Sequence, residues 1–234
     1  MNVKSLLKKL IKFLAKLVLG FLLVSVFFVL LYRFIPPPAT PFMFIRVFEN
    51  IMVGEQPKLK KDWEPISDIS PHLVMAVIAA EDQNFMNHFG FDIKAIEKAQ
   101  KFNKRQKGKK VRGASTISQQ TAKNLFLWQG RSWLRKGFEV YFTFLIELLW
   151  SKERIMEVYL NIIEMGDGIY GAEAAAQKYF NKNASALSKR EAALIAAVLP
   201  NPRKWSPAQP TNYISRRQNW IIRNINNLNK PEFL

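Results

Sequence analysis

The first 35 residues constrain this chain most, because they combine dense positive charge with a long apolar run. Lysines stand at positions 4, 8, 9, 12 and 16, and residues 17–32 then carry no charged side chain. That run is slightly short of the roughly 20 residues that cross a bilayer, but Lys16 and Arg33 can extend their stems and make up the difference. The segment predicts a membrane anchor, and its positive flank predicts a cytoplasmic N-terminus with the remainder translocated.

The alternative to an anchor is a cleavable signal peptide. The stretch RFIPPPATPF offers no clean small-x-small cleavage site, and the apolar run is at the upper length limit for a signal peptide. We therefore favour a basic N-terminal segment at 1–16 and an uncleaved transmembrane helix at 17–35. A linker or membrane-proximal segment at 36–60, stiffened by three prolines at its start, then leads to one domain at 61–234.

Charge and composition narrow the function classes. The formal net charge is +17, so the natural partner surface is anionic: nucleic acid, anionic lipid headgroups or a phosphate-bearing substrate. Much of this charge lies in residues 98–112. This segment is interpreted equally as a mobile, solvated loop and as a surface that lies near lipid headgroups or phosphates. The absence of cysteine excludes disulfides and thiolate metal sites, and two histidines argue against a histidine-rich metal site.

The remaining pattern predicts a mainly α fold, since few segments alternate with the period of two typical of strands. Residues 40–66 show no strong periodicity of apolar residues, so the sequence predicts either a short strand or a short helix there. The longest predicted helix covers about 132–160, and its apolar middle, YFTFLIELLW, is too short to span a bilayer and favours a buried central helix. A last amphipathic helix is expected at about 214–228. Helix starts are signalled by Ser70 with Pro71, Asp92, Thr116 with Gln119, and Ser188 with Glu191.

Two carboxylates, Glu81 and Asp82, follow the apolar run that starts near Ser70. A carboxylate at the C-terminal end of an apolar helix faces the negative end of the helix dipole and low-dielectric surroundings. Both effects raise its pKa, which suits it to act as a general acid or base. An exposed acid in the last helical turn is the plainer interpretation, and the residues alone leave both open. Phe85 and His88 would share the face of Glu81 on a continued helix, and we interpret His88 as a packed, hydrogen-bonded residue.

A second polar stretch, GASTISQQTAKN, covers residues 113–124. Ser115 and Thr116 lie at a predicted helix N-terminus, whose free backbone N–H groups attract anions. The next two turns add amide and cationic side chains: Gln119, Gln120, Lys123 and Asn124. This pattern predicts a phosphate-binding surface without a Walker sequence, whereas an ordinary capped surface helix would not need so many polar groups.

A third stretch places Arg131, Arg135 and Lys136 before Glu139. The plainer interpretation is a surface pair between Arg135 and Glu139, worth about 0.2–0.5 kcal/mol. Next to an apolar helix, Glu139 is alternatively a second, partly buried carboxylate held by cations. Two carboxylates beside a phosphate-binding surface suggest glycosyl chemistry with a charged leaving group.

With these blocks in order, the chain resembles the peptidoglycan glycosyltransferases of glycosyltransferase family 51, in their monofunctional, membrane-anchored, biosynthetic form. The resemblance covers essentially everything after the anchor, and no C-terminal transpeptidase domain is expected. One mild departure is GAST, where many members have two glycines before the Ser-Thr pair. The matching blocks are EDQNFMNHFG, GASTISQQTAKN, RKGFE, KERIMEVYLN, GIYGAEAAAQKYF and REAALIAAVLPNP.

The resemblance implies a lysozyme-like fold with a small membrane-proximal lobe, and polymerisation of lipid II into β-1,4-linked glycan strands. It assigns Glu81 as the base that deprotonates the acceptor sugar's 4-hydroxyl, with inversion and loss of undecaprenyl pyrophosphate. Glu139 would belong to the donor side. The residues implied to orient the pyrophosphate are Lys123, Arg131, Arg135 and Lys136. Those implied to contact sugar or phosphate are Ser115, Gln119, Gln120 and Asn124. Those implied to hold Glu81 in position are Asp82, Phe85 and His88.

The resemblance also implies partners and a location. The partners are lipid II, undecaprenyl-pyrophosphate-linked glycan, the membrane and other cell-wall synthesis proteins, with no nucleic acid. The location is the bacterial inner membrane, crossed once, with a periplasmic catalytic domain. No cofactor is required, although a divalent cation, Mg²⁺ or Mn²⁺, assists the pyrophosphate in the family; this sequence shows no dedicated metal motif.

Two alternatives remain. A lysozyme-like hydrolase or lytic transglycosylase shares the fold but needs neither an anchor nor a dense cationic site. A tethered nucleic-acid-binding protein would interleave basic residues with exposed aromatics, whereas the aromatics here concentrate in the anchor and the apolar central helix.

Overall fold

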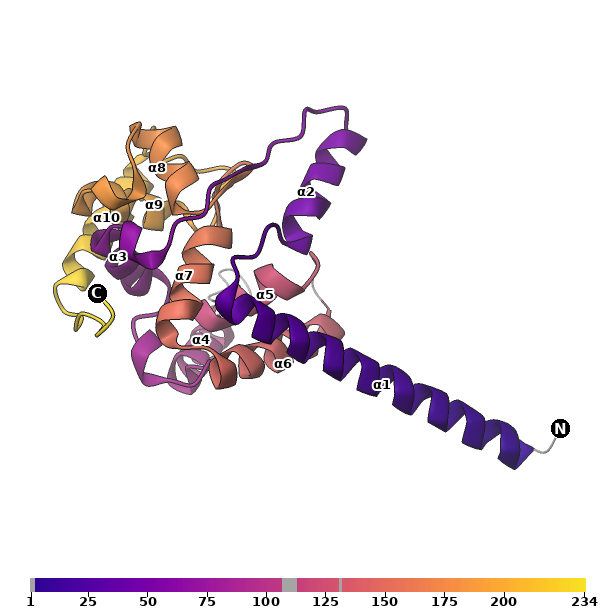
Figure 1. Ribbon diagram of the computed structural model, residues 1–234. Coiled ribbons are helices and arrows are strands. Elements are labelled where there is room, and N and C mark those ends of the chain that lie inside the picture. Colours follow the sequence, from indigo (N-terminus) through magenta and orange to yellow (C-terminus); the bar gives the residue numbers. More distant parts are fainter. Residues whose placement is uncertain (1–2, 107–112, 131) are drawn as a thin grey trace. The chain divides into compact units, whose positions relative to one another are not determined.

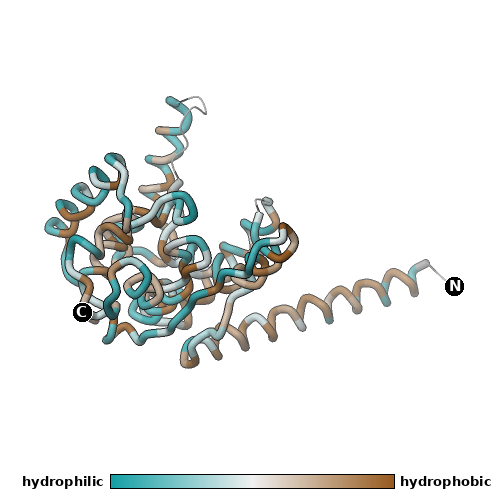
Figure 2. The backbone as a smooth tube through the Cα atoms, turned by 90° about the horizontal axis from the view of Figure 1, so that it is seen from above, coloured by the Kyte–Doolittle hydropathy of each residue, from teal (hydrophilic) through white to brown (hydrophobic). Residues whose placement is uncertain are grey.

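The structure is a computed structural model that describes residues 3–106, 113–130 and 132–234. It divides into two units, Met1–Pro36 and Pro37–Leu234. The first unit is one helix, α1 (Val3–Phe34), which is hydrophobic along most of its length (Figure 2). Within the described residues, Leu6–Phe34 is the one helical stretch long and apolar enough to cross a membrane. The predicted bounds of the anchor and of the soluble domain stay predictions.

The second unit is mainly helical, as predicted, with one small sheet (Figure 1). In this sheet β1 (Lys60–Lys61) runs parallel to the central strand β3 (Ile169–Tyr170), and β2 (Glu164–Gly166) runs antiparallel to it. Its helices are α2 (Pro41–Met52), α3 (Pro71–Glu81), α4 (Ile93–Arg105), α5 (Ile117–Phe126), α6 (Trp133–Leu149), α7 (Lys152–Ile162), α8 (Ala172–Phe180), α9 (Lys189–Val198) and α10 (Asn212–Ile225). Its strands are β1 (Lys60–Lys61), β2 (Glu164–Gly166) and β3 (Ile169–Tyr170), and its 3-10 helices are η1 (Ile66–Asp68), η2 (Phe85–Asn87) and η3 (Ala184–Ala186).

The four predicted helix starts are confirmed by their caps. Ser70 accepts a hydrogen bond from the His72 N–H, and Pro71 begins α3. Asp92 caps α4 by accepting the Ala95 N–H at 2.8 Å. Both capping boxes form in full, at the start of α5 and of α9. Each helix therefore begins where a local side chain satisfies its free N–H groups.

Two other expectations change. The single helix predicted at about 132–160 is wrong, because the chain breaks between α6 and α7. Trp150 and Ser151 are extended there, and the Ser151 hydroxyl accepts the Arg154 N–H at 3.1 Å. For residues 40–66 the sequence left a short helix and a short strand both open, and the structure contains both: the helix α2 and the short strand β1.

Packing in the core holds α3 in place. Helix α3 packs against α9 and α10, while α5 packs against α2, α6 and α7. Leu73, Val74 and Val77 of α3 are fully buried, so this helix is apolar on nearly every side. Such burial fixes the position of its last residue, Glu81, where α3 meets the start of α5.

Glycine is required at position 90, in the turn before α4. Gly90 has φ +76°, and a Cβ atom there would lie 2.7 Å from Thr143 Cγ2 and 3.0 Å from Glu147 Cγ. Its carbonyl accepts a 2.6 Å hydrogen bond from the Thr116 hydroxyl, which ties the turn to α5. The turn thereby fixes the chain that follows Glu81.

We expect Gly90→Ala to lower the free energy of unfolding by about 2–4 kcal/mol, through backbone strain and overpacking. Denaturant unfolding in detergent solution measures this. The matched control is Gly137→Ala on α6, where a Cβ meets nothing within 4 Å and where removing a helical glycine should stabilise by about 0.5–1 kcal/mol. Equal stability of the two variants would contradict the close approach at Gly90.

Candidate active site

Glu81 ends α3 and its carboxylate is held by two side chains from distant helices. Gln120 of α5 donates from Nε2 to Oε2 at 3.0 Å. Arg217 of α10 lies with Nη2 3.4 Å from Oε1. The Glu81 side chain is 15% exposed, so it is accessible from one side while enclosed on the others.

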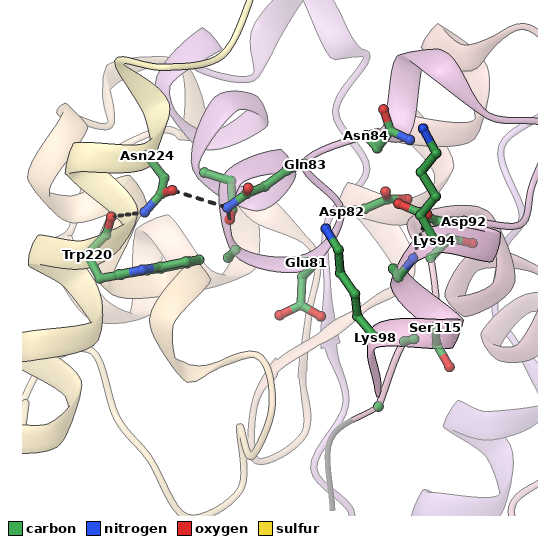
Figure 3. A pocket seen from close by; sticks show the side chains of 16 residues that line it. Glu81, Asp82, Gln83, Asn84, Asp92, Lys94, Lys98, Ser115, Trp220 and Asn224 are labelled. Atoms are coloured by element: carbon green, nitrogen blue, oxygen red, sulfur yellow. Dashed lines mark hydrogen bonds between the residues drawn. The ribbon is translucent and has the colours of Figure 1, made fainter. Parts of the chain in front are cut away.

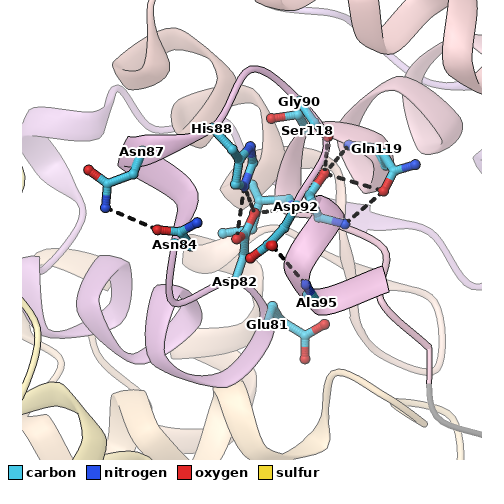
Figure 4. A network of polar contacts seen from close by, with 12 residues as sticks. Glu81, Asp82, Asn84, Asn87, His88, Gly90, Asp92, Ala95, Ser118 and Gln119 are labelled. Carbon is cyan, nitrogen blue, oxygen red and sulfur yellow. Dashed lines mark hydrogen bonds and ion pairs between the residues drawn. The ribbon is translucent and has the colours of Figure 1, made fainter. Parts of the chain in front are cut away.

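Asp82 anchors the chain beside Glu81. It is the residue that follows the last turn of α3, and its carboxylate lies 3.0 Å from His88 Nε2 through either oxygen (Figure 4). Oδ2 also accepts the Ile117 N–H, at 3.0 Å, at the start of α5. Because a carboxylate only accepts, His88 donates from Nε2. The pair joins the end of α3 to the start of α5, the helix that carries Gln120.

Phe85 and His88 lie on a separate turn and not on a continued α3, because η2 follows the helix end. Phe85 is fully buried, with its ring 6.4 Å from that of His88 in an edge-on arrangement. Lys152 of α7 covers this corner, donating to the His88 carbonyl at 2.7 Å and lying 4.6 Å from the Phe85 ring centroid. These contacts favour the supporting role proposed for Asp82, Phe85 and His88.

Burial is the largest influence on Glu81 and raises its pKa. The hydrogen bond from Gln120 and the positive charges of Arg217 and Lys123 lower the pKa, but by less than burial raises it. A buried carboxylate with a raised pKa is a stronger base once ionised than an exposed one, and proton transfer works best when pKa and pH are close. Glu81 therefore has the environment of a general base.

Two residues of this site were missed by the sequence analysis. Arg217 lies on the last amphipathic helix, where the sequence pattern predicts that an arginine is exposed to solvent. Tyr159 of α7 is fully buried and donates to Gln120 Oε1 at 3.4 Å. Burial, with Glu81 and Asp82 nearby, raises the pKa of Tyr159 well above its usual value, so it remains a hydrogen-bond donor. Tyr159 orients the Gln120 amide so that its nitrogen faces Glu81.

A cation cluster, formed by Lys123, Arg135 and Lys136, surrounds the second carboxylate. Glu139 is buried on α6, with Lys136 Nζ 2.5 Å from Oε1 and Arg135 Nη1 3.9 Å from Oε2. Burial lowers the pKa of Lys123 most, Arg135 and Lys136 lower it further, and Glu139 and Glu81 raise it. Lys123 thus interacts electrostatically with both carboxylates and links the two halves of the site.

Unpaired donors accompany this cluster. Asn124 Nδ2 and Arg135 Nε are buried and, among the described residues, have no hydrogen-bond partner. A buried N–H group without a partner carries a desolvation cost of about 1–3 kcal/mol, and an anionic ligand would remove it. Asn124 and Arg135 lie on α5 and α6, which pack together, so this face of the cluster is suited to phosphate oxygens.

The remaining predicted positions divide into three groups. Gln119 is buried in the cap of α5, where its Oε1 accepts the Thr116 N–H at 3.1 Å, so its oxygen serves the helix start. Ser115 is exposed and lines a pocket next to Glu81 (Figure 3). Arg131 lies outside the described residues.

A protein-held divalent cation does not fit the described side chains. No group of three or more His, Cys, Asp or Glu among them could hold a metal ion. Glu139 is already paired with two cations, so it is not arranged as a metal ligand.

The arrangement can accept a proton at Glu81 and stabilise negative charge on a ligand at the cation cluster. Comparisons with known proteins agree with this chemistry. The transglycosylase family model matches residues 49–226. The biosynthetic peptidoglycan transglycosylase of Pseudomonas syringae pv. syringae (strain B728a) is 53% identical over 228 residues, which are 97% of this chain and 96% of that protein. The protein of the same name in Bacteroides thetaiotaomicron is 54% identical over 220 residues, 94% of this chain and 88% of that protein.

Proposed function

Because this chain belongs to the transglycosylase family, we propose that it is a biosynthetic peptidoglycan glycosyltransferase that polymerises lipid II into glycan strands. The observation that carries the proposal is the pairing of a buried, accessible carboxylate at Glu81 with the cation cluster around Glu139. The relatives that match nearly the full chain are named as biosynthetic enzymes. The polymerase is thus favoured over the lytic alternative.

In the proposed reaction, Glu81 takes the proton from the 4-hydroxyl of the acceptor sugar. The hydroxyl oxygen bonds to the anomeric carbon of the growing strand as the bond to pyrophosphate breaks, so the configuration inverts. Gln120 and Arg217 hold the ionised carboxylate in place. Lys123, Arg135 and Lys136 neutralise the charge that develops on the leaving pyrophosphate, which is a large contribution in a partly desolvated site. The three side chains supply the compensating positive charge.

A membrane location follows from the same proposal, because both substrates carry a lipid. The lysines before the apolar run would keep the N-terminus cytoplasmic and place the catalytic unit outside the inner membrane. In that unit, α2 exposes Phe44, Phe48 and Met52, and α6 exposes Phe144 and Leu148. Exposed aromatic and aliphatic side chains on helices favour contact with a lipid surface. Contacts with other cell-wall synthesis proteins stay a prediction.

The test is incubation of the full chain, in detergent or liposomes, with purified lipid II. Appearance of long glycan strands that a glycan-cleaving enzyme digests is the expected result. Preformed glycan strands, incubated in parallel, should keep their length. Shortening of preformed strands with no synthesis from lipid II would favour the lytic enzyme and overturn the proposal.

Replacing Arg217 tests whether this residue controls the pKa of Glu81. Since Arg217 lowers the pKa of Glu81, Arg217→Gln should raise that pKa further. The base is active only when ionised, so the acidic limb of the kcat/KM profile should move to higher pH. Arg216→Gln is the matched control, because Arg216 is the exposed neighbour on the same helix. An acidic limb that stays in place in Arg217→Gln would show that Arg217 does not act through Glu81.

A further inference from the structure

A buried ion pair joins the two helices that meet at the chain break after α6. Glu147 lies in the last turn of α6 and Lys152 is the first residue of α7, with Nζ 2.7 Å from Oε1. The Glu147 side chain is 3% exposed and that of Lys152 is 19% exposed. Replacing a buried ion pair by uncharged residues of similar volume is often neutral for stability. The pair is therefore better explained by the geometry that it imposes than by the stability that it adds.

Lys152 directs its ammonium group to three partners. Besides Glu147, Nζ donates to the His88 carbonyl at 2.7 Å and lies 4.6 Å from the centroid of the Phe85 ring. An ammonium group has three N–H donors that point in different directions, so one lysine can serve all three partners at once. His88 and Phe85 belong to the turn that follows Glu81. Lys152 thereby fixes that turn to the end of α6.

The carboxylate of Glu147 also contacts a third helix. Its Oε1 accepts a hydrogen bond from the Ser118 hydroxyl, which is buried in the first turn of α5. The preceding residue, Ile117, donates its N–H to Asp82 Oδ2 at 3.0 Å, and Asp82 in turn accepts from His88 Nε2 (Figure 4). These contacts return to their starting point and form a closed network. Its members are Asp82, His88, Lys152, Glu147, Ser118 and Ile117.

The closed network connects the elements that carry both halves of the candidate site. Asp82 follows Glu81 directly, and Ser118 lies two positions before Gln120, which donates to Glu81. Glu147 is on the same helix as Glu139, the carboxylate of the cation cluster. Neither Glu147 nor Lys152 lines the pocket beside Glu81. The pair can therefore influence the base only through the network.

We propose that Glu147 and Lys152 are positioning residues for the reaction. Their ion pair fixes the end of α6 against the turn after Glu81 and the start of α5. It thereby sets the position of the Glu81 carboxylate relative to the cation cluster, without contact with the substrate. This rests on the proposed function, since it names the residues that hold the proposed base in place.

The main test is the double variant Glu147→Gln, Lys152→Met in the full chain, purified in detergent. It removes both charges together, so neither is left buried without its partner, and its thermal unfolding temperature should stay near that of wild type. The kcat with purified lipid II should fall by about 10²-fold, because a small misplacement of reacting groups has a large effect on rate. KM for lipid II should stay near the wild-type value, because the cation cluster is unchanged. A merely structural pair would leave kcat per folded molecule unaltered.

Two single variants keep the test decisive if the double variant fails to fold. Ser118→Ala opens the network at α5 while the ion pair remains, and should lower kcat by about two- to tenfold, the effect of one hydrogen bond. Lys152→Arg keeps the charge opposite Glu147, so it should recover part of the kcat lost in Lys152→Met. It should not recover all, because a planar guanidinium does not reproduce the donor directions of an ammonium group. A wild-type kcat in Ser118→Ala would contradict the proposal.

Hydrogen exchange, measured by mass spectrometry, examines the network without turnover. Peptides that cover residues 82–90 and 117–118 should exchange faster in the double variant, because the turn and the start of α5 lose a shared anchor. Exchange in these peptides at the wild-type rate would show that the ion pair does not hold them.

The matched control is the double variant Glu164→Gln, Arg203→Met. It removes another ion pair, 3.1 Å long, whose carboxylate side chain is 7% exposed and which belongs neither to the closed network nor to the candidate site. It should keep the wild-type kcat. A wild-type kcat in Glu147→Gln, Lys152→Met would overturn this inference and leave the polymerase function intact. A wild-type chain that makes no glycan from lipid II would overturn the proposed function itself.

Discussion

Replacing Glu81 by glutamine is expected to lower the rate of glycan polymerisation by about 10²–10⁴-fold, the usual contribution of a general base. Glutamine keeps the shape of the side chain but cannot take the proton of the acceptor hydroxyl. The bond from Gln120 can be replaced by an amide–amide contact, so the end of α3 should stay in place. Initial rates with purified lipid II, together with thermal unfolding of the same preparation, measure the effect.

The control is Glu97→Gln, which removes an exposed carboxylate of α4 that lines neither the pocket nor the cation cluster. It should keep the wild-type rate. Binding of lipid II to Glu81→Gln should also stay close to wild type, because the proton transfer occurs after binding. If Glu81→Gln polymerised at the wild-type rate, the base would have to be another residue.

Local signals made much of the fold predictable from the sequence. The capping boxes at Thr116 and Ser188 and the Ser70–Pro71 pair act within four residues, and all three mark helix starts in the structure. The break at Ser151 was missed because the apolar pattern continues across it. There the cap on α7 outweighs a periodicity that would equally suit one long helix.

The site was predictable where its residues are close in sequence. Asp82 with His88, Thr116 with Gln119, and Lys136 with Glu139 all pair within six positions. The partners of Glu81 come from further away: Gln120 lies 39 positions along the chain and Arg217 lies 136. Gln120 was predicted as an amide donor in the first turns of α5, without its partner. Arg217 reaches Glu81 from a helix whose pattern alone favours solvent, because the packing of α10 on α3 brings the two residues together.

Glu139 offers the second large effect, through the cation cluster. Glu139→Gln should lower the rate at neutral pH by about 10²-fold or more, because Lys136 and Arg135 lose the carboxylate that positions them for the pyrophosphate. The same change removes a charge that raises the pKa of Lys123. With its pKa lowered further, Lys123 loses its proton at a lower pH, so the alkaline limb of the kcat profile should move toward neutrality.

Lys123→Arg separates the two consequences of that change. An arginine stays charged throughout the accessible pH range, so adding it to Glu139→Gln should abolish the displaced alkaline limb even if the rate at neutral pH stays low. Glu153→Gln, which alters an exposed carboxylate at the start of α7, should leave both rate and profile at wild-type values. If Glu139→Gln kept the wild-type rate and the alkaline limb did not move, the role of Glu139 would be limited to a structural ion pair. The leaving group would then have to be stabilised by Lys123, Arg135 and Lys136 without a carboxylate to hold them.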